Sequence, residues 1–168
     1  MSRGPATIQS RGKVLAAEEF ARALPAGARL LGLDVGTKTV GLALSDVTRT
    51  IASGLTTLAR GKFSADARRL LELAQEHGVG GFVIGLPISL DGSEGPRAQA
   101  TRAFARNLGR LTPLPILLWD ERLTTAAAER SLLEADVSRR RRAQVIDKVA
   151  ATLILQSTLD RLELFDGG

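Results

Sequence analysis

Three acidic residues lie in apolar surroundings in this sequence, where a carboxylate needs a physical reason to be present. Asp34 falls within an apolar run, Glu121 comes just after another one, and Asp147 has mostly apolar neighbours along the chain. Burying an unpaired carboxylate costs several kcal/mol or forces it to take up a proton, so such acids usually have a partner, stand at a strand end or bind a cation. The three acids are therefore the first candidates for chemistry.

Cation binding is the function that would use all three acids together. Clustered carboxylates repel one another, and a hard divalent cation with oxygen ligands, usually Mg²⁺ or Mn²⁺, relieves that repulsion. Two such ions about 3.5–4 Å apart activate water and stabilise the leaving oxygen of a phosphodiester. We therefore predict Asp34, Glu121 and Asp147 as metal ligands and catalytic residues. Each acid alone has an ordinary alternative: a turn cap for Asp34, and surface ion pairs for the others, Glu121 with Arg122 and Asp147 with Lys148 or Arg142.

The pattern of apolar residues predicts the elements that position these acids. Residues 29–35, 40–45 and 50–58 are predicted strands joined by tight turns, which makes an antiparallel meander. Residues 82–86 and 116–119 are short apolar strands, each preceded by a predicted helix, from Ser64 to Gly78 and from Pro96 to Leu111. Because strands that alternate with helices form parallel crossovers, the sequence predicts an α/β fold with a five-stranded mixed sheet and helices on both faces.

In such a sheet the first strand lies centrally, which lets acids from different strands approach one another. Asp34 stands late in the first strand and Glu121 just past the last one. A short helix is predicted for residues 126–135, and a long final helix, about residues 139–164, carries Asp147 one or two turns from its start. If that helix packs on the sheet, Asp147 completes the group.

Basic residues close to these acids are candidates for binding nucleic-acid phosphates. A run of four arginines opens the predicted final helix, where cations oppose the helix dipole, whereas phosphates favour both helix N-termini and arginine forks. Aromatic residues make up only 4% of the chain, so recognition of the nucleic-acid backbone fits better than base stacking. A solvated surface is the ordinary alternative for each cation. The candidates are Lys38, Arg122, Arg139, Arg140, Arg141 and Arg142.

Composition restricts the functions that remain. The 168 residues suit one domain, and no apolar run approaches the roughly 18 residues that cross a bilayer, so we do not expect a membrane protein. The absence of cysteine excludes thiolate chemistry and fits a reducing compartment, which we expect to be the cytoplasm, and His77 as the single histidine excludes His-rich metal sites. The net charge of +5 favours a polyanionic partner, with simple solubility as the alternative.

Four motifs, in order along the chain, resemble the YqgF family, also called RuvX. They are LDVGTKTVGLALSD at 33–46, VIGLP at 83–87 with LDGSEGP at 90–96, WDERLTT at 119–125 and IDKVAATLILQ at 146–156. The resemblance implies a ribonuclease H-like fold and a metal-dependent nuclease with catalytic acids at Asp34, Glu121 and Asp147. It further implies 5′-end processing of pre-16S ribosomal RNA in ribosome biogenesis or, by analogy of fold, Holliday junction resolution in DNA recombination and repair; the sequence does not choose between a ribosomal RNA precursor and branched DNA.

The chain departs from the ribonuclease H-like pattern at the fourth strand. Many such nucleases place an acid at the end of that strand, whereas this chain has Gly85, Leu86 and Pro87 there, so Glu121 must supply that ligand from elsewhere. The first 28 residues also exceed the compact family domain. We predict an N-terminal extension at 1–28, with a disordered tail (1–12) and a short helix (13–24), a nuclease domain at 29–164 and a C-terminal tail at 165–168.

Two other functions remain open at this point. The Asp-Val-Gly-Thr turn at residues 34–37 also resembles the first turn of actin-like and sugar-kinase ATPases, although 168 residues do not supply the second lobe that closes over ATP. A non-catalytic protein that binds RNA or associates with the ribosome would keep the acids only as remnants. No oligomeric state follows from the sequence alone.

Overall fold

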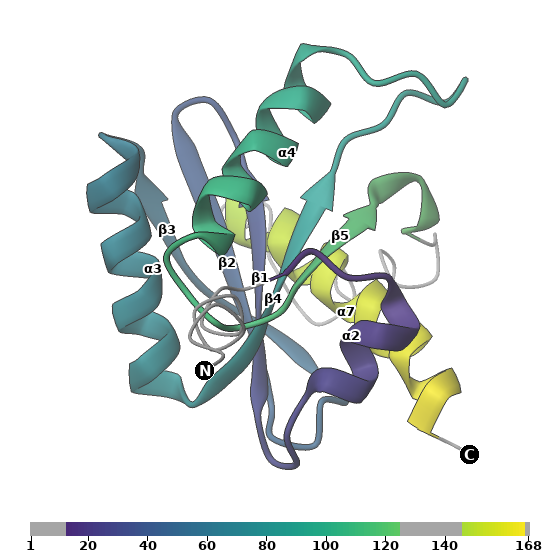
Figure 1. The fold of residues 1–168 in the computed structure, drawn as a ribbon. Helices are drawn as coiled ribbons and strands as arrows, with labels where there is room; N and C mark the ends of the chain where they lie inside the picture. Colours follow the sequence, from purple (N-terminus) through teal and green to yellow (C-terminus); the bar gives the residue numbers. More distant parts are fainter. Residues whose placement is uncertain (1–12, 125–145, 167–168) are drawn as a thin grey trace, which may run out of the picture.

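The computed structural model describes residues 13–124 and 146–166, and the side chains of residues 13–124 and 149–165. A five-stranded mixed sheet lies at its centre in the order β3-β2-β1-β4-β5 (Figure 1). The predicted fold class is therefore confirmed. The strands are β1 (Arg29–Val35), β2 (Thr39–Ser45), β3 (Ala52–Ala59), β4 (Val79–Leu86) and β5 (Ile116–Asp120).

The central strand β1 joins the antiparallel and parallel halves of the sheet. It pairs antiparallel with β2, where Asp34 lies opposite Gly41, and parallel with β4, where Leu33 lies beside Ile84. β4 in turn pairs parallel with β5, so that Gly85 lies beside Trp119. The carboxyl ends of β1, β4 and β5 consequently meet at one edge of the sheet, as the predicted crossovers require.

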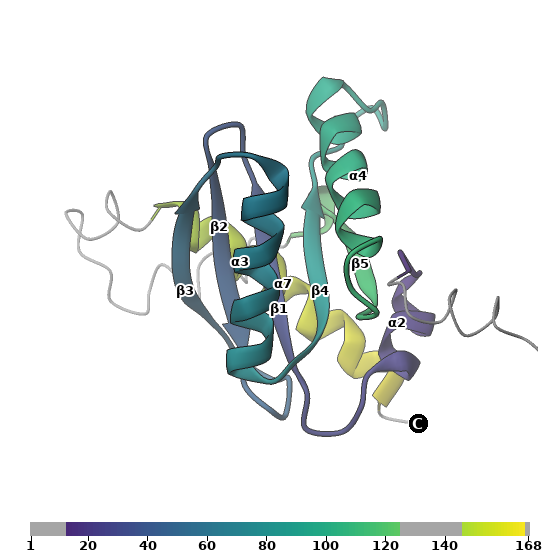
Figure 2. The same cartoon turned by 60° about the vertical axis from the view of Figure 1, so that its left-hand side comes forward.

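Helices cover both faces of the sheet. Figures 1 and 2 show α3 (Phe63–His77) and α4 (Pro96–Gly109) on one face, and α7 (Ile146–Asp166) with the short α2 (Ala17–Ala23) on the other. Leu31 and Leu33 of β1 pack into the core beneath α3 and α4, whereas Leu30 packs into the core beneath α7. Because side chains alternate along a strand, Asp34 shares the α7 face with Leu30 and Gly32.

Helix α7 runs antiparallel to β1 and approaches it closely. A Cβ added at Gly32 would lie 2.8 Å from the Cβ of Leu155, which only glycine avoids. Further along α7, Gln156 donates a hydrogen bond to the Thr50 carbonyl (3.0 Å) and accepts one from the Ala52 amide (2.9 Å), close to the start of β3. Helix α7 therefore begins at the end of the sheet where Asp34 lies.

The N-terminal segment differs from the predicted helix at 13–24. Residues before α2 are extended instead: the Ile116 amide donates to the Lys13 carbonyl and the Leu15 amide donates to the Ile116 carbonyl, both at 2.8 Å. This short pairing covers the start of the β5 edge, where unpaired backbone groups favour an added strand over a helical turn. Phe20 of α2 is then fully buried beneath the sheet.

Two details of α3 and α4 also differ from the prediction. Helix α3 begins at Phe63, one residue before the predicted start at Ser64, where a serine can cap a helix; no side chain caps it, and Asp66 of its first turn is buried and accepts a hydrogen bond from the Gly61 amide (3.1 Å). The apolar residues at helical spacing in the predicted helix, Ala100, Phe104, Leu108 and Leu111, indicate one buried stripe; Phe104 and Leu108 are buried, but Ala100 and Leu111 are exposed. The buried side of α4 also includes Ala98, Thr101 and Ala105, and Leu111 lies beyond the end of the helix at Gly109.

The predictions for residues 1–12, for a helix at 126–135 and for a helix start near residue 139 lie outside the described residues. The described part of the final helix, α7, begins at Ile146. No helix in the described ranges combines the length and the apolar content that crossing a bilayer requires.

Candidate active site

Two of the three predicted catalytic acids meet at the carboxyl edge of the sheet. Leu33 of β1 and Ile84 of β4 lie side by side in the sheet, and Asp34 and Gly85 are the residues that follow them. Glu121 follows directly after β5, as the first residue of a short 3₁₀ turn (η1, Glu121–Leu123). Its Oε2 lies 2.8 Å from the point that a Cβ of Gly85 would occupy. The Glu121 carboxylate therefore sits over Gly85, beside the strand that carries Asp34.

Glu121 is electrostatically coupled to Asp34. Burial raises the pKa of the Glu121 carboxyl above its ordinary value and the Asp34 carboxylate raises it further, whereas the Arg97 guanidinium opposes the shift. Two carboxylates that repel each other at a partly buried edge are the oxygen donors that Mg²⁺ or Mn²⁺ prefers. The donor chemistry of this edge thus fits a hard divalent cation.

Replacing Glu121 with glutamine is expected to stabilise the metal-free protein at neutral pH. The pKa of the Glu121 carboxyl is higher in the folded than in the unfolded state, so binding a proton there stabilises the folded protein. This stabilisation is fully present below the ordinary pKa of about 4.5 and is lost as pH rises through the pKa of the folded state. Glutamine keeps the shape of the side chain without the charge. In a chelator at neutral pH, the melting temperature of the Glu121→Gln variant should therefore exceed that of wild type. The difference between the two melting temperatures should narrow toward pH 4.5.

Glu163→Gln, at an exposed position of α7, serves as the matched control and should leave the melting temperature unchanged. Added Mn²⁺ should stabilise wild type more than the Glu121→Gln variant, because an ion that binds the folded state alone raises its stability. Identical melting temperatures for wild type and Glu121→Gln at neutral pH would contradict the repulsion between the two carboxylates.

Arg122 pairs with the acid before Glu121 rather than with Glu121 itself. Its Nη2 donates to Asp120 Oδ2 at 2.7 Å and its Nε donates to both oxygens at 3.1 Å. The Asp120 carboxylate also accepts the Arg122 amide at 2.9 Å, and these bonds hold the pKa of Asp120 below its ordinary value. Glu121 is thereby left to face Asp34, and the role of Arg122 in nucleic-acid binding stays a prediction.

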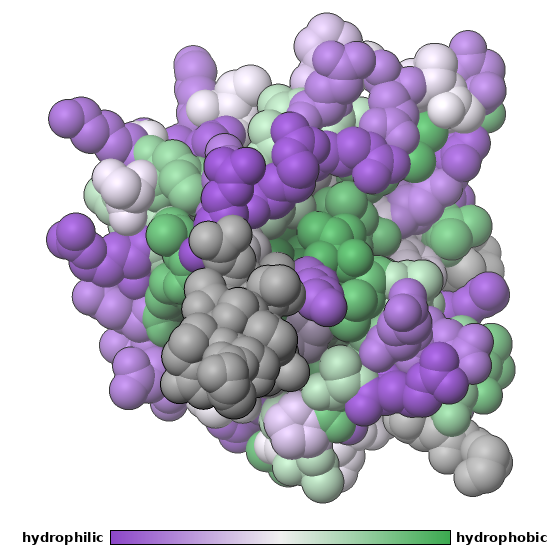
Figure 3. All heavy atoms as spheres, viewed as in Figure 1, coloured by the Kyte–Doolittle hydropathy of each residue, from purple (hydrophilic) through white to green (hydrophobic). Residues whose placement is uncertain are grey.

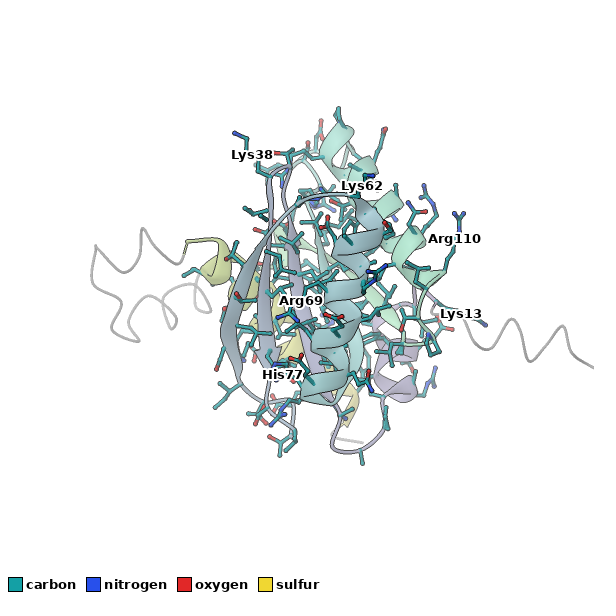
Figure 4. All side chains as sticks on the ribbon, turned by 90° about the vertical axis from the view of Figure 1, so that its left-hand side faces the viewer. Lys13, Lys38, Lys62, Arg69, His77 and Arg110 are labelled. Atoms are coloured by element: carbon teal, nitrogen blue, oxygen red, sulfur yellow. The ribbon has the colours of Figure 1, made fainter. Side chains whose placement is uncertain are left out.

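Lys38 lies in the turn between β1 and β2, four residues beyond Asp34. The side chain is exposed, and Figure 4 shows it at the same end of the molecule as Lys62, with His77 at the other end. Arg60 holds this turn in place: its Nη1 donates to the Gly36 carbonyl at 2.7 Å and its amide donates to the Lys38 carbonyl at 2.9 Å. Lys38 is therefore placed at the edge of the candidate site by a braced turn.

The remaining predicted site residues fall outside the described side chains. Asp147 is the second residue of α7, one turn before Ala151, so its backbone lies at the Asp34 end of the sheet. The predicted clamp of Arg139, Arg140, Arg141 and Arg142 lies wholly outside the described residues. Among the side chains that are described, no three acidic, histidine or cysteine groups gather to hold a metal ion. The roles of Asp147 and the clamp stay predictions.

Two residues of this edge were not among the predicted site residues. Gly85 stands where many ribonuclease H-like nucleases have an acid. Because glycine has no side chain, the Glu121 carboxylate can occupy the space above it. Arg97, in the first turn of α4, interacts with Glu121. Its signal in the sequence was its position after Gly95-Pro96, at the loop that leaves the carboxyl end of β4.

A five-stranded sheet in the order β3-β2-β1-β4-β5, in which β2 alone runs antiparallel to the other strands and the central strand carries an acid near its carboxyl end, defines the ribonuclease H-like class of proteins. One solved structure with this fold is T. thermophilus RuvC in complex with Holliday junction substrate: its TM-score is 0.52 at 13% sequence identity, over 81% of this chain and 96% of that chain. At this identity the likeness concerns the fold alone.

The chain belongs to the RuvX family. The family model, described as Holliday junction resolvase, matches residues 28–161, which confirms the resemblance carried by the four motifs. A relative from Paracoccus denitrificans (strain Pd 1222) is 63% identical over 145 residues, covering 86% of this chain and 92% of the relative. One from Rhodobacter capsulatus is 61% identical over 145 residues, covering 86% and 91%. Both carry the name "Putative pre-16S rRNA nuclease".

Proposed function

We propose that the protein is a metal-dependent nuclease that hydrolyses phosphodiester bonds in the 5′-end processing of pre-16S ribosomal RNA. The observation that carries this proposal is the coupled pair of Asp34 and Glu121 at the carboxyl edge of a ribonuclease H-like sheet. The RuvX family assignment supports it, as does the name that relatives more than 60% identical carry.

In this proposal Asp34, Glu121 and Asp147 hold Mg²⁺ or Mn²⁺. The bound metal would supply an activated water and stabilise the charge that develops on the leaving oxygen. The chain itself orients the ligands: β1 fixes Asp34, and the 3₁₀ turn after β5 lays Glu121 over Gly85. Glu121 must lose its proton before it can bind a cation, so acidic solution should weaken metal binding.

Nucleic acid is the proposed partner, bound through its backbone by cations around this edge. Lys38 and Arg122 stand on either side of the acids in the fold, and the arginine run at 139–142 adds four charges in the sequence before α7. Residues 29–164 form the proposed nuclease domain, with 1–28 as an extension and 165–168 as a tail. A ribosomal RNA precursor as substrate implies a cytoplasmic protein that meets the assembling ribosome.

A four-way DNA junction is the second candidate substrate. The description of the matching family model favours it. The two substrates are chemically distinct, since RNA offers 2′-hydroxyl groups and a junction offers four duplex arms. They can therefore be separated by one experiment.

The test is a cleavage panel with purified full-length protein. Pre-16S RNA, a four-way DNA junction and plain RNA and DNA duplexes are each incubated with Mg²⁺, with Mn²⁺ and with a chelator. We expect cleavage near the mature 5′ end of the RNA, only with metal. Preferred cutting of the junction would transfer the assignment to the second candidate. Binding of RNA without any metal-dependent cleavage would overturn the enzyme and favour a non-catalytic binder.

A further inference from the structure

Three arginines surround the loop at residues 88–95, which connects β4 to α4 beside the candidate site. Arg122 contacts this loop, since its Nη1 lies 3.8 Å from the point that a Cβ of Gly92 would occupy, and it is paired with Asp120. Arg102 of α4 makes a two-bond ion pair with Glu94 of the loop, at 2.6 and 2.7 Å. Both guanidinium groups are thus already paired with a carboxylate, Arg102 with Glu94 of the loop and Arg122 with Asp120 of β5.

The third arginine, Arg97, has no such partner. Within the described part of the chain, no carboxylate forms an ion pair with it and no hydrogen bond involves its guanidinium group. Its side chain is exposed to solvent. A guanidinium group that no carboxylate holds can bind an incoming anion without first breaking an ion pair.

The topology places Arg97 at the catalytic edge. Helix α4 begins where the loop from the carboxyl end of β4 returns to the sheet, the same edge that Asp34 and Glu121 occupy (Figure 1). Arg97 is the second residue of α4 and interacts electrostatically with Glu121. Figure 3 shows hydrophilic side chains over the region of α4.

We propose that Arg97 binds a backbone phosphate of the nucleic-acid substrate next to the scissile bond. This inference rests on the proposed nuclease function and adds a phosphate contact to those predicted from the sequence for other basic residues. The guanidinium fork of Arg97 offers paired N–H donors that match two phosphate oxygens. Such a contact positions the backbone and carries no base preference.

The experiment compares Arg97→Gln with Arg106→Gln, a matched control on the same helix. Arg106 is also exposed and also lacks an ion pair in the described part of the chain, but it lies near the far end of α4. Binding of a labelled pre-16S 5′-end RNA is followed by fluorescence anisotropy in chelator, where no cleavage occurs, over a series of salt concentrations. A role exerted only through Glu121 and its metal would leave these metal-free measurements unchanged.

We expect Arg97→Gln to weaken binding about tenfold at low salt and to reduce the slope of log affinity against log salt by about 1. Arg97→Lys should keep the salt slope and recover only part of the affinity, because an ammonium group lacks the fork. Arg106→Gln should stay close to wild type. Circular dichroism should show that all variants are folded, since both positions are at the surface.

Equal affinities and slopes for Arg97→Gln and Arg106→Gln would overturn the inference. The fate of the proposed function is read separately, from cleavage by wild type with Mg²⁺ or Mn²⁺. If wild type cuts RNA and Arg97→Gln binds and cuts it equally well, the inference about Arg97 is contradicted and the proposed function is not. Wild type that binds but cuts nothing contradicts the nuclease function, and the binding comparison then still decides whether Arg97 contacts the backbone.

Discussion

Asp34→Asn is expected to abolish metal-dependent cleavage, lowering kcat by about 10³- to 10⁴-fold. The substitution keeps the size of the side chain but removes the charge that a divalent cation needs, and cation stabilisation of the transition state is worth several kcal/mol, with about 1.4 kcal/mol for each factor of ten. Asp34 is partly buried on a central strand whose pairing does not depend on its charge, so the fold should persist. Single-turnover cleavage of pre-16S RNA measures the loss.

Asp160→Asn provides the control for this variant. Asp160 is an exposed acid in the second half of α7, thirteen residues beyond Asp147, and accepts a hydrogen bond from Gln156 at 3.1 Å. The Asp160→Asn variant should cleave like wild type. The Asp34→Asn variant should bind RNA in chelator as tightly as wild type or slightly more tightly, since a negative charge near the phosphates is removed. Cleavage by Asp34→Asn within tenfold of wild type would show that Asp34 is no metal ligand.

The sheet could be predicted because its strands carry strong local signals. The apolar stretch around Leu31 and Leu33 is buried on both faces of a central strand, and the helices between the later strands force parallel crossovers. Gly78 ends α3 in the left-handed conformation, with φ of 66°, as its position after the helical pattern predicts. These features depend on residues close together in the chain.

The segment before β1 was predicted less well because its structure depends on a distant partner. Lys13 and Leu15 are extended only because Ile116, about a hundred residues later, offers free backbone groups at the edge of the sheet. Helical spacing of apolar residues continues through this segment and predicts one helix, yet pairing with β5 takes its first residues. Local periodicity could not reveal that edge.

The pairing of charges at the site was equally beyond the sequence. Asp120 and Glu121 are adjacent, and either could take Arg122 as a partner. The turn at the end of β5 gives Arg122 to Asp120, through both side-chain and amide hydrogen bonds, and directs Glu121 over β4 toward Asp34. The sequence named Asp34 and Glu121 as candidates, but the partners of the acids around the last strand depend on backbone geometry after that strand.

Gly85→Ala is expected to lower kcat about 100-fold and to destabilise the fold by about 1–3 kcal/mol, although it adds a single methyl group. The new Cβ would lie 2.8 Å from Glu121 Oε2 and 2.5 Å from Ile154 Cδ1. Neither atom can keep its place, so the Ile154 side chain must repack and the Glu121 carboxylate must leave its position over β4. Chemical denaturation measures the loss of stability, and cleavage of pre-16S RNA by the folded protein measures the loss of kcat.

Adding Ile154→Val separates the two effects of Gly85→Ala. Valine removes Cδ1, the nearer atom of α7, so Gly85→Ala should cost less stability in this background, while the conflict with Glu121 and the loss of kcat remain. Gly80→Ala, at the other end of β4, puts a Cβ 2.5 Å from Ala28 Cβ and should destabilise the protein without lowering kcat. If Ile154→Val restored activity together with stability, packing against α7 and not displacement of Glu121 would be the reason that position 85 of β4 is glycine.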